Sequence, residues 1–368
     1  MPRALTRAGD NGGVSPSPLL VRLRAETAHL VTSLTTFGPS IGRRWPLAVQ
    51  AGLAMAVPIV VLALAGRSDV ALLAASGAFT VIYGGWLRPR QRARFAPIMA
   101  LVLFTCAAAG VLAAGGGTIV VLLGALVLTV VAASLAGWFS LGPPGPVFFV
   151  LVYGLSTQVT AIRDGVRIVD PGVYLGVVAA SSAFACLLVV LPLLLPRYRR
   201  EQVRPVRTLF PRRWGGVAQT LAVRAAIVAI VGVGAAVFID PERSYWIICA
   251  GLAVVGMPVG RRAAAARGIH RTVGTVFGAV VYLGLALLPL PIWALGLLLG
   301  ALQVVIELTV VRHYALAVLF ITPLVLLLIG AASGEGANIT LALERVVDTI
   351  VGAAVGTIAA LAVRLRDE

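Results

Sequence analysis

The chain has 368 residues, of which 60% are hydrophobic and only 12% are charged. Soluble globular domains carry roughly 25% charged residues, so the composition excludes a soluble fold and predicts an all-α polytopic membrane protein. The formal net charge is +16, but the cations are all arginines that gather in short loops between apolar runs. This distribution indicates membrane topology and argues against a nucleic-acid partner.

Residues 1–43 are predicted to form a cytoplasmic tail. Within it, residues 19–34 alternate leucines with charged side chains, a pattern typical of an amphipathic helix on the membrane surface and also compatible with a disordered tail. Twelve apolar runs follow, each near the length of about 20 residues that crosses a bilayer. The predicted spans are 45–66, 70–87, 96–114, 118–138, 145–162, 173–195, 218–238, 244–260, 272–288, 292–311, 314–332 and 345–363.

The arginines beside these spans predict that both termini are cytoplasmic, because positive charge near a span marks its inner end. With this orientation, twenty arginines flank the inner ends of the spans. Only five flank the outer ends, namely Arg67, Arg163, Arg167, Arg243 and Arg345.

The two halves of the chain repeat each other at an offset of 174 residues. Leu47-Ala-Val-Gln50-Ala matches Leu221-Ala-Val-Arg224-Ala, and the same offset superimposes every predicted span. Six spans per half predict a parallel repeat about an axis along the membrane normal. The predicted domains are a degenerate first repeat (44–195), an Arg- and Pro-rich cytoplasmic linker (196–217) and a second repeat (218–364).

Ionisable residues inside the spans are expensive and are candidates for function. Arg224, Glu307 and Asp348 lie within second-repeat spans, and the first repeat has Gln50, Ala133 and Tyr174 at the corresponding positions. Glu307 and Arg224 lie at a similar depth toward the cytoplasm. They are predicted either to couple transport to protons or to form a static ion pair between two helices.

Two second-repeat spans each carry an arginine, a threonine and glycines on one helical face. The span 272–288 and its flank carry Arg271, Gly274, Thr275, Gly278 and Tyr282, and the span 345–363 carries Arg345, Asp348, Thr349, Gly352 and Gly356. Because arginine binds carboxylates bidentately, these faces predict a path for an anionic solute, with Arg271 at the inner mouth and Arg345 at the outer mouth. A packing seam of small residues is the alternative.

The aromatic and cysteine residues give weaker indications of function. The aromatic residues Tyr245, Trp246, Tyr282, Trp293 and Tyr314 lie mostly near span ends, where an interfacial belt is expected. Cys106, Cys186 and Cys249 lack metal-ligand spacing. The sequence has no phosphate-binding loop, metal cluster or nucleophile–base set, so we expect no enzyme activity, catalytic residue, metal or cofactor.

Several second-repeat motifs together resemble the fusaric acid resistance family of aromatic acid exporters. The resemblance covers roughly residues 218–364 and rests on Arg224, Tyr245-Trp246, the basic loop 261–271, Arg271-Thr-Val-Gly274-Thr-Val-Phe-Gly278, His313-Tyr314-Ala-Leu-Ala-Val-Leu-Phe-Ile-Thr322 and Arg345-Val-Val-Asp348-Thr-Ile-Val-Gly352. The sequence is also distantly similar to plant aluminium-activated malate transporters, which are anion channels. Larger family members carry a substantial cytoplasmic domain where this chain has only the linker 196–217.

The resemblance implies a multi-pass protein of the bacterial inner membrane that exports aromatic carboxylic acids or related amphipathic compounds with the proton gradient. The expected partners are the lipid bilayer and a small organic anion. The sequence is also compatible with a homo-oligomer. Arg271 and Arg345 would attract the carboxylate, Thr275, Thr322 and Thr349 would line its path, and Glu307 or Asp348 would carry protons. A passive anion channel and a non-transporting membrane scaffold are the alternatives.

Overall fold

The computed structural model describes residues 32–38, 42, 44–199, 205, 208, 210, 214–332 and 337–365. Residues Met1–Phe37 and Gly38–Glu368 are two separate units. The first contributes one helical turn at residues 32–35. Most of the predicted amphipathic segment 19–34 and most of the linker 196–217 therefore lie outside the described residues.

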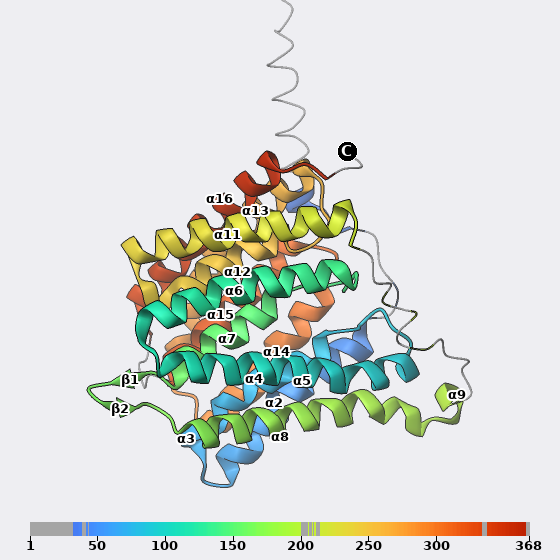
Figure 1. Ribbon diagram of the computed structural model, residues 1–368. Helices are drawn as coiled ribbons and strands as arrows, with labels where there is room; N and C mark the ends of the chain where they lie inside the picture. Colours follow the sequence, from blue (N-terminus) through green and yellow to red (C-terminus); the bar gives the residue numbers. More distant parts are fainter. Residues whose placement is uncertain are drawn as a thin grey trace, which may run out of the picture. The chain divides into compact units, whose positions relative to one another are not determined.

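The second unit is helical, which confirms the helical part of the predicted fold class (Figure 1). Its α-helices are α2 (Trp45–Leu64), α3 (Ser68–Ala71), α4 (Ala75–Ala78), α5 (Pro89–Ala114), α6 (Gly117–Trp138), α7 (Val147–Val159), α8 (Pro171–Val190), α9 (Pro196–Arg199), α11 (Gly216–Ile239), α12 (Ser244–Val255), α13 (Arg261–Ala286), α14 (Ile292–Thr309), α15 (Tyr314–Ala332) and α16 (Ile339–Ala362). The 3-10 helices are η1 (Leu72–Ala74), η2 (Phe79–Ile82), η3 (Leu191–Leu194) and η4 (Pro241–Arg243).

Two short strands, β1 (Ile162–Arg163) and β2 (Val166–Arg167), pair as an antiparallel hairpin between α7 and α8. The hairpin turn is formed by Asp164 and Gly165, with φ angles of 51° and 79°. Positive φ at both positions is what a two-residue turn between twisted strands requires, and Asp-Gly is a preferred pair for it.

Nine helices of the described residues are long and apolar enough to cross a membrane. They correspond to nine of the twelve predicted spans. The other three predicted spans contain shorter elements. Residues 68–82 form a chain of helical turns from α3 to η2, α7 has 13 residues, and α12 has 12.

The short helix α12 ends where the sequence stops a helix. After α12 the chain reaches Gly256 and Pro258, and a residue before proline is sterically driven away from helical backbone angles.

Two of the short elements are almost completely buried by protein. Eleven of the twelve residues of α12 are buried, as are all residues from Val70 to Val81. Their apolar character therefore reflects burial inside the helix bundle.

Corresponding helices of the two halves make corresponding contacts. In the second half α13 packs on α15 and α16, and in the first half α5 packs on α7 and α8. Between the halves, α2 packs on α14 and α11 packs on α6. In Figure 1 the helices α11, α6, α5 and α8 form one layer, with α12 behind it in contact with helices of both halves. The twelve spans, their orientation and the repeat itself stay predictions.

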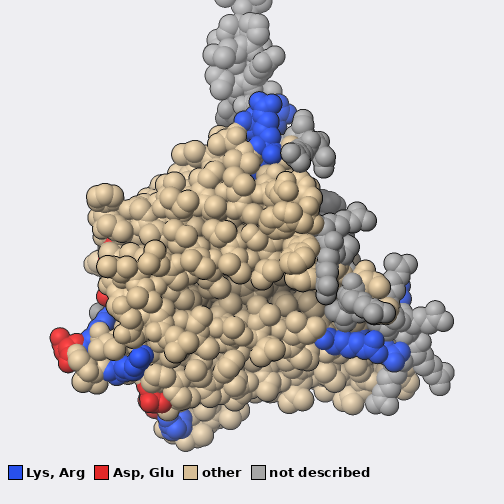
Figure 2. All heavy atoms as spheres, in the orientation of Figure 1, with Lys and Arg blue, Asp and Glu red and all other residues tan. Residues whose placement is uncertain are grey.

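The outer surface of the bundle is apolar. Figure 2 shows the charged side chains gathered at the margins of the view, with a continuous uncharged surface between them. Large hydrophobic side chains on the long helices are exposed, among them Leu112 (78%) and Phe238 (91%). Such a surface suits contact with lipid, so the chain is a multi-pass membrane protein.

Glycines bring α12 and α16 into backbone contact at the centre of the second half. A Cβ atom added to Gly356 would lie 2.7 Å from the carbonyl oxygen of Gly251, and one added to Gly352 would collide with the carbonyl oxygen of Ile247. These positions must lack side chains for the two backbones to meet, as in other close helix crossings of membrane proteins.

We expect Gly352→Ala to destabilise the protein by about 1–3 kcal/mol, because the backbone of α12 has to move away from the new methyl group. Thermal unfolding of the purified protein in detergent measures this effect. Gly234→Ala is the matched control, since a Cβ there meets no atom within 4 Å. An unchanged unfolding temperature for Gly352→Ala would contradict the close crossing.

Candidate functional site

Arg345, in the second turn of α16, is buried without a partner for its charge. It is 5% exposed, and its guanidinium carbon lies 4.6 Å from the ring centre of Trp246 on α12. Among the described residues, its Nε atom has no hydrogen-bond partner and no carboxylate lies within ion-pair distance of the guanidinium. A desolvated cation–π contact contributes about 2 kcal/mol, whereas the effective cost of burying an ion is several kcal/mol. An anion beside Arg345 would offset this cost.

The polar side chains near Arg345 are also buried without hydrogen bonds. Asp348 and Thr349 are both 0% exposed. Neither carboxylate oxygen of Asp348, nor Oγ1 of Thr349, nor Nε1 of Trp246 has a hydrogen-bond partner within the described part of the chain. A buried polar group left unsatisfied costs about 1–3 kcal/mol. Because several such groups lie on α12 and α16, this region is the strongest candidate for binding a polar ligand.

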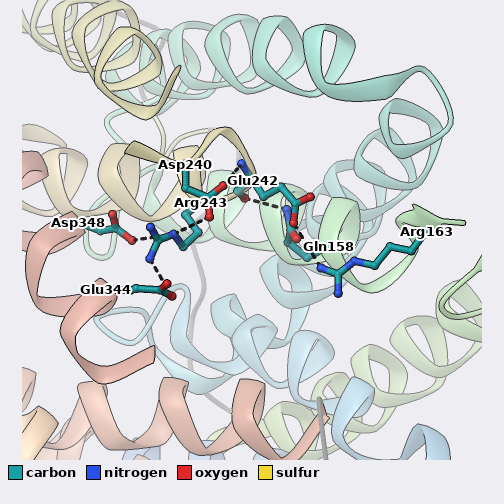
Figure 3. A network of polar contacts seen from close by, with 7 residues as sticks. All are labelled: Gln158, Arg163, Asp240, Glu242, Arg243, Glu344 and Asp348. Carbon is teal, nitrogen blue, oxygen red and sulfur yellow. Dashed lines mark hydrogen bonds and ion pairs between the residues drawn. The ribbon is translucent and has the colours of Figure 1, made fainter. Parts of the chain in front are cut away.

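Arg243, the last residue of η4, stands at one end of this region (Figure 3). Its Nε atom lies 3.0 Å from Oδ2 of Asp240, and its Nη1 atom lies 2.8 Å from Oε2 of Glu344 on α16. The carboxylate of Asp348 points toward the same guanidinium, but its closest approach to Nε is 3.9 Å. Arg243 thus holds the turn before α12 against α16 and is the nearest cation to the buried Asp348.

The network continues from the second half to the hairpin loop of the first half (Figure 3). Nε2 of Gln158, on α7, donates to the backbone carbonyl of Glu242 at 2.7 Å, and Arg163 of β1 pairs with the Glu242 carboxylate at 3.3 Å. Both Arg163 and Glu242 are more than half exposed. Exposed ion pairs contribute at most about 1 kcal/mol, so this outer part can break easily.

Arg271 lies ten residues into α13, because this helix begins at Arg261 and not near residue 272 as predicted. Its Nη1 atom donates to the hydroxyl of Tyr314 at 3.0 Å, and Arg267, one turn earlier, lies over the Tyr314 ring at 5.0 Å. Arg271 and Arg345 are close enough for their charges to interact. The two arginines that were predicted at opposite mouths therefore both lie within the bundle.

The threonines and glycines of the predicted path occupy helix crossings. A Cβ on Gly278 would lie 2.7 Å from the carbonyl oxygen of Leu319, so α13 and α15 meet at this glycine. Thr275 is 2% exposed beside it, and the hydroxyl of Thr322 donates to the carbonyl of Val318 at 3.0 Å. These contacts account for the glycine spacing on α13 by packing. Thr322 bonds within its own helix, whereas the buried hydroxyl of Thr349 has no hydrogen-bond partner among the described residues.

Arg224 is completely buried and binds backbone. Its guanidinium donates to the carbonyls of Val363 (2.8 Å from Nη2) and Val259 (2.9 Å from Nη1). The carbonyls in the last turn of a helix have no partner inside that helix, so Arg224 satisfies the end of α16 and joins it to the chain between α12 and α13. These contacts indicate a structural role.

Glu307, 3% exposed on α14, pairs with Arg44 just before α2, and Nη2 of Arg44 lies 3.1 Å from Oε2 of Glu307. Nε2 of Gln303 also donates to the Glu307 carboxylate at 3.3 Å. No ion pair joins Glu307 to Arg224 in the described structure. The predicted pairing of Arg224 with Glu307 is therefore not found, and the ion pair of Glu307 links α14 to the first half of the chain.

The first half has a neutral and satisfied group where the second half has Asp348. At the position 174 residues before Asp348, the hydroxyl of Tyr174 lies 2.9 Å from the Ser156 hydroxyl and 3.4 Å from that of Ser76. Tyr174 is 0% exposed. Buried polar groups are normally paired in this way, so Tyr174 is satisfied at the position where Asp348 has no hydrogen bond among the described residues.

Sequence reasoning missed three residues of this region. Trp246 was assigned to an interfacial belt but is 2% exposed in the core, whereas Trp293, at 45%, fits such a belt. Arg243 was counted as an outer flanking charge, and Tyr314 as a span-end aromatic. The sequence did contain a signal in the order of the motifs. Arg243 and Trp246 lie at the start of α12, and Arg345 and Asp348 likewise lie near the start of α16.

One of three comparisons with known proteins found a match. A model of the fusaric acid resistance protein-like family matches residues 220–359, which confirms the resemblance over that segment. This segment contains α12, α13, α14, α15 and most of α11 and α16. A search of curated proteins and a search of solved structures found no match.

Proposed function

We propose that this chain, whose residues 220–359 match the fusaric acid resistance protein-like family, is a secondary transporter that exports small organic anions through the second half. The family match supports a transporter-type membrane protein of the fusaric acid resistance type rather than an enzyme. The proposed substrates are aromatic carboxylic acids or related amphipathic compounds. The proposed location is the bacterial inner membrane, with both termini in the cytoplasm.

The observation that carries this proposal is the unpaired guanidinium of Arg345. The buried charges between α12, α13 and α16 are the two positive ones of Arg271 and Arg345 and the negative one of Asp348. The sum is one positive charge, which a monovalent anion would balance. A carboxylate suits Arg345 because the planar guanidinium binds it through two parallel hydrogen bonds.

Asp348 is the proposed proton carrier, in preference to Glu307. A carboxylate that alternately takes up and releases a proton must not be locked in a strong hydrogen-bonded ion pair. Glu307 is bound to Arg44 and Gln303, whereas Asp348 has no hydrogen bond among the described residues and lies 3.9 Å from Arg243.

The twelve-span repeat forms part of the proposal. Matching contacts of α5 with α7 and α8, and of α13 with α15 and α16, support two related halves. The reciprocal contacts of α2 with α14 and of α11 with α6 support an axis between them. In this arrangement the first half, with its neutral Tyr174 group, serves as the scaffold against which the second half works.

We expect Arg345→Gln to reduce benzoate flux into reconstituted vesicles roughly ten- to hundredfold, since a hydrogen bond to a charged group contributes about 1.5–3 kcal/mol. The measurement is uptake of radiolabelled benzoate under an imposed pH gradient. Arg262→Gln is the control, because it removes the same charge from an exposed position on α13, and this variant should transport normally. Equal flux in Arg345→Gln and wild type would overturn the anion site. No flux of any tested anion in wild type would favour a membrane scaffold.

Asp348→Asn is expected to abolish uphill benzoate movement driven by a pH gradient while leaving downhill flux in place, because the asparagine cannot exchange protons. Glu307→Gln is the matched control on the other buried carboxylate and should keep the coupling. Uphill movement that survives Asp348→Asn would remove Asp348 from the mechanism. Wild-type current that follows voltage alone, with no response to pH gradient, would identify a passive anion channel.

A further inference from the structure

A second pair of arginines lies one turn apart on α13, separate from the Arg345–Trp246 contact. Arg267 and Arg271 are four residues apart, so both project from the same side of the helix. The Nε atoms of both are buried without hydrogen-bond partners in the described residues, and no carboxylate there lies within ion-pair distance of either guanidinium. Two neighbouring positive charges of this kind repel each other, and an anion between them would relieve the repulsion.

One side chain now occupies the space that such an anion would take. The Tyr314 ring lies under Arg267 at 5.0 Å, and its hydroxyl oxygen accepts the hydrogen bond from Arg271 at 3.0 Å. A phenol therefore offers the two arginines a flat ring and an oxygen atom. An aryl carboxylate would offer the same two features with a full negative charge in place of the hydroxyl, so it would bind both guanidinium groups more strongly.

Tyr314 can leave this position without unfolding a helix. It is the first residue of α15, where no preceding helical turn restricts its side-chain rotamers. The start of α15 is held independently by His313, whose Nδ1 accepts a hydrogen bond from the backbone N–H of Leu316 at 3.1 Å. The His313 ring in turn lies parallel to that of His270, with the ring centres 6.2 Å apart.

We propose that Arg267 and Arg271 form a second anion subsite for aryl carboxylates and that the Tyr314 side chain closes it in this structure. This inference rests on the proposed function, because it supplies the entry step for the same substrate. Arg271, which also interacts electrostatically with Arg345, is the residue that the two subsites share. An incoming anion displaces Tyr314, binds Arg267 and Arg271, and then passes from Arg271 to Arg345.

Equilibrium binding of radiolabelled benzoate to the purified full-length chain in lipid nanodiscs tests the subsite without requiring transport. Wild type should bind one benzoate per chain with high affinity, at the Arg345 subsite. Tyr314→Ala should bind two, and the double variant Tyr314→Ala/Arg267→Ala should return to one. Arg262→Ala, which removes an exposed charge near the start of α13, is the control and should bind one benzoate.

The two proposals fail in different ways. If Tyr314→Ala binds one benzoate, or if its second benzoate survives Arg267→Ala, the inner subsite is wrong while the Arg345 site stands. If Arg345→Gln leaves the wild-type benzoate in place, the Arg345 assignment is wrong whatever Tyr314→Ala shows. The unfolding temperature of each variant in the same nanodiscs must match that of wild type. If Tyr314→Ala proves unstable, Tyr314→Phe replaces it. This variant keeps the ring and should bind between one and two benzoates per chain.

Discussion

Backbone contact between α12 and α16, made through Gly251, Gly352 and Gly356, determines where the functional groups of the second half lie. Because these glycines let the two helices meet, Trp246 and Arg345 are pressed together in a volume that excludes solvent. A longer distance between the helices would admit water and hydrate the guanidinium. The small residues are therefore both packing elements and the cause of the low-dielectric setting in which the unpaired charge of Arg345 would bind the proposed anion strongly.

The buried polar groups of the bundle fall into two kinds. Arg224 and Tyr174 have hydrogen-bond partners in the structure and hold helices together. Arg345, Asp348 and Thr349 lack them, and all three lie on α16 near the Arg243 ion pairs. Since folding selects against unsatisfied buried groups, those that persist at one place are most simply explained by a ligand and a proton that bind there.

Hydropathy predicted the nine long helices of the described residues, because a helix that crosses the lipid needs a run of about 20 apolar residues. Hydropathy predicted helices that are too long at 70–87, 145–162 and 244–260. The reason is that the apolar sequence of a helix such as α12 is the same whether protein or lipid covers it. Hydropathy also placed the starts of α13 and α16 too late, since charges at Arg261 or Glu344 end an apolar run but do not end a helix. The partners of Arg224 and Glu307 could not be predicted, because backbone carbonyls and Arg44 come from distant segments.

The most direct measurement is an experimental structure with 4-bromobenzoate bound, in which the anomalous signal of bromine locates the ligand. The account predicts a carboxylate against the guanidinium of Arg345, within hydrogen-bond reach of Thr349. It also predicts that Asp348 stays close to Arg243, as it is here. Bromine density only at the lipid-facing surface, with Arg345 still resting on Trp246 and no ligand beside it, would contradict the central claim.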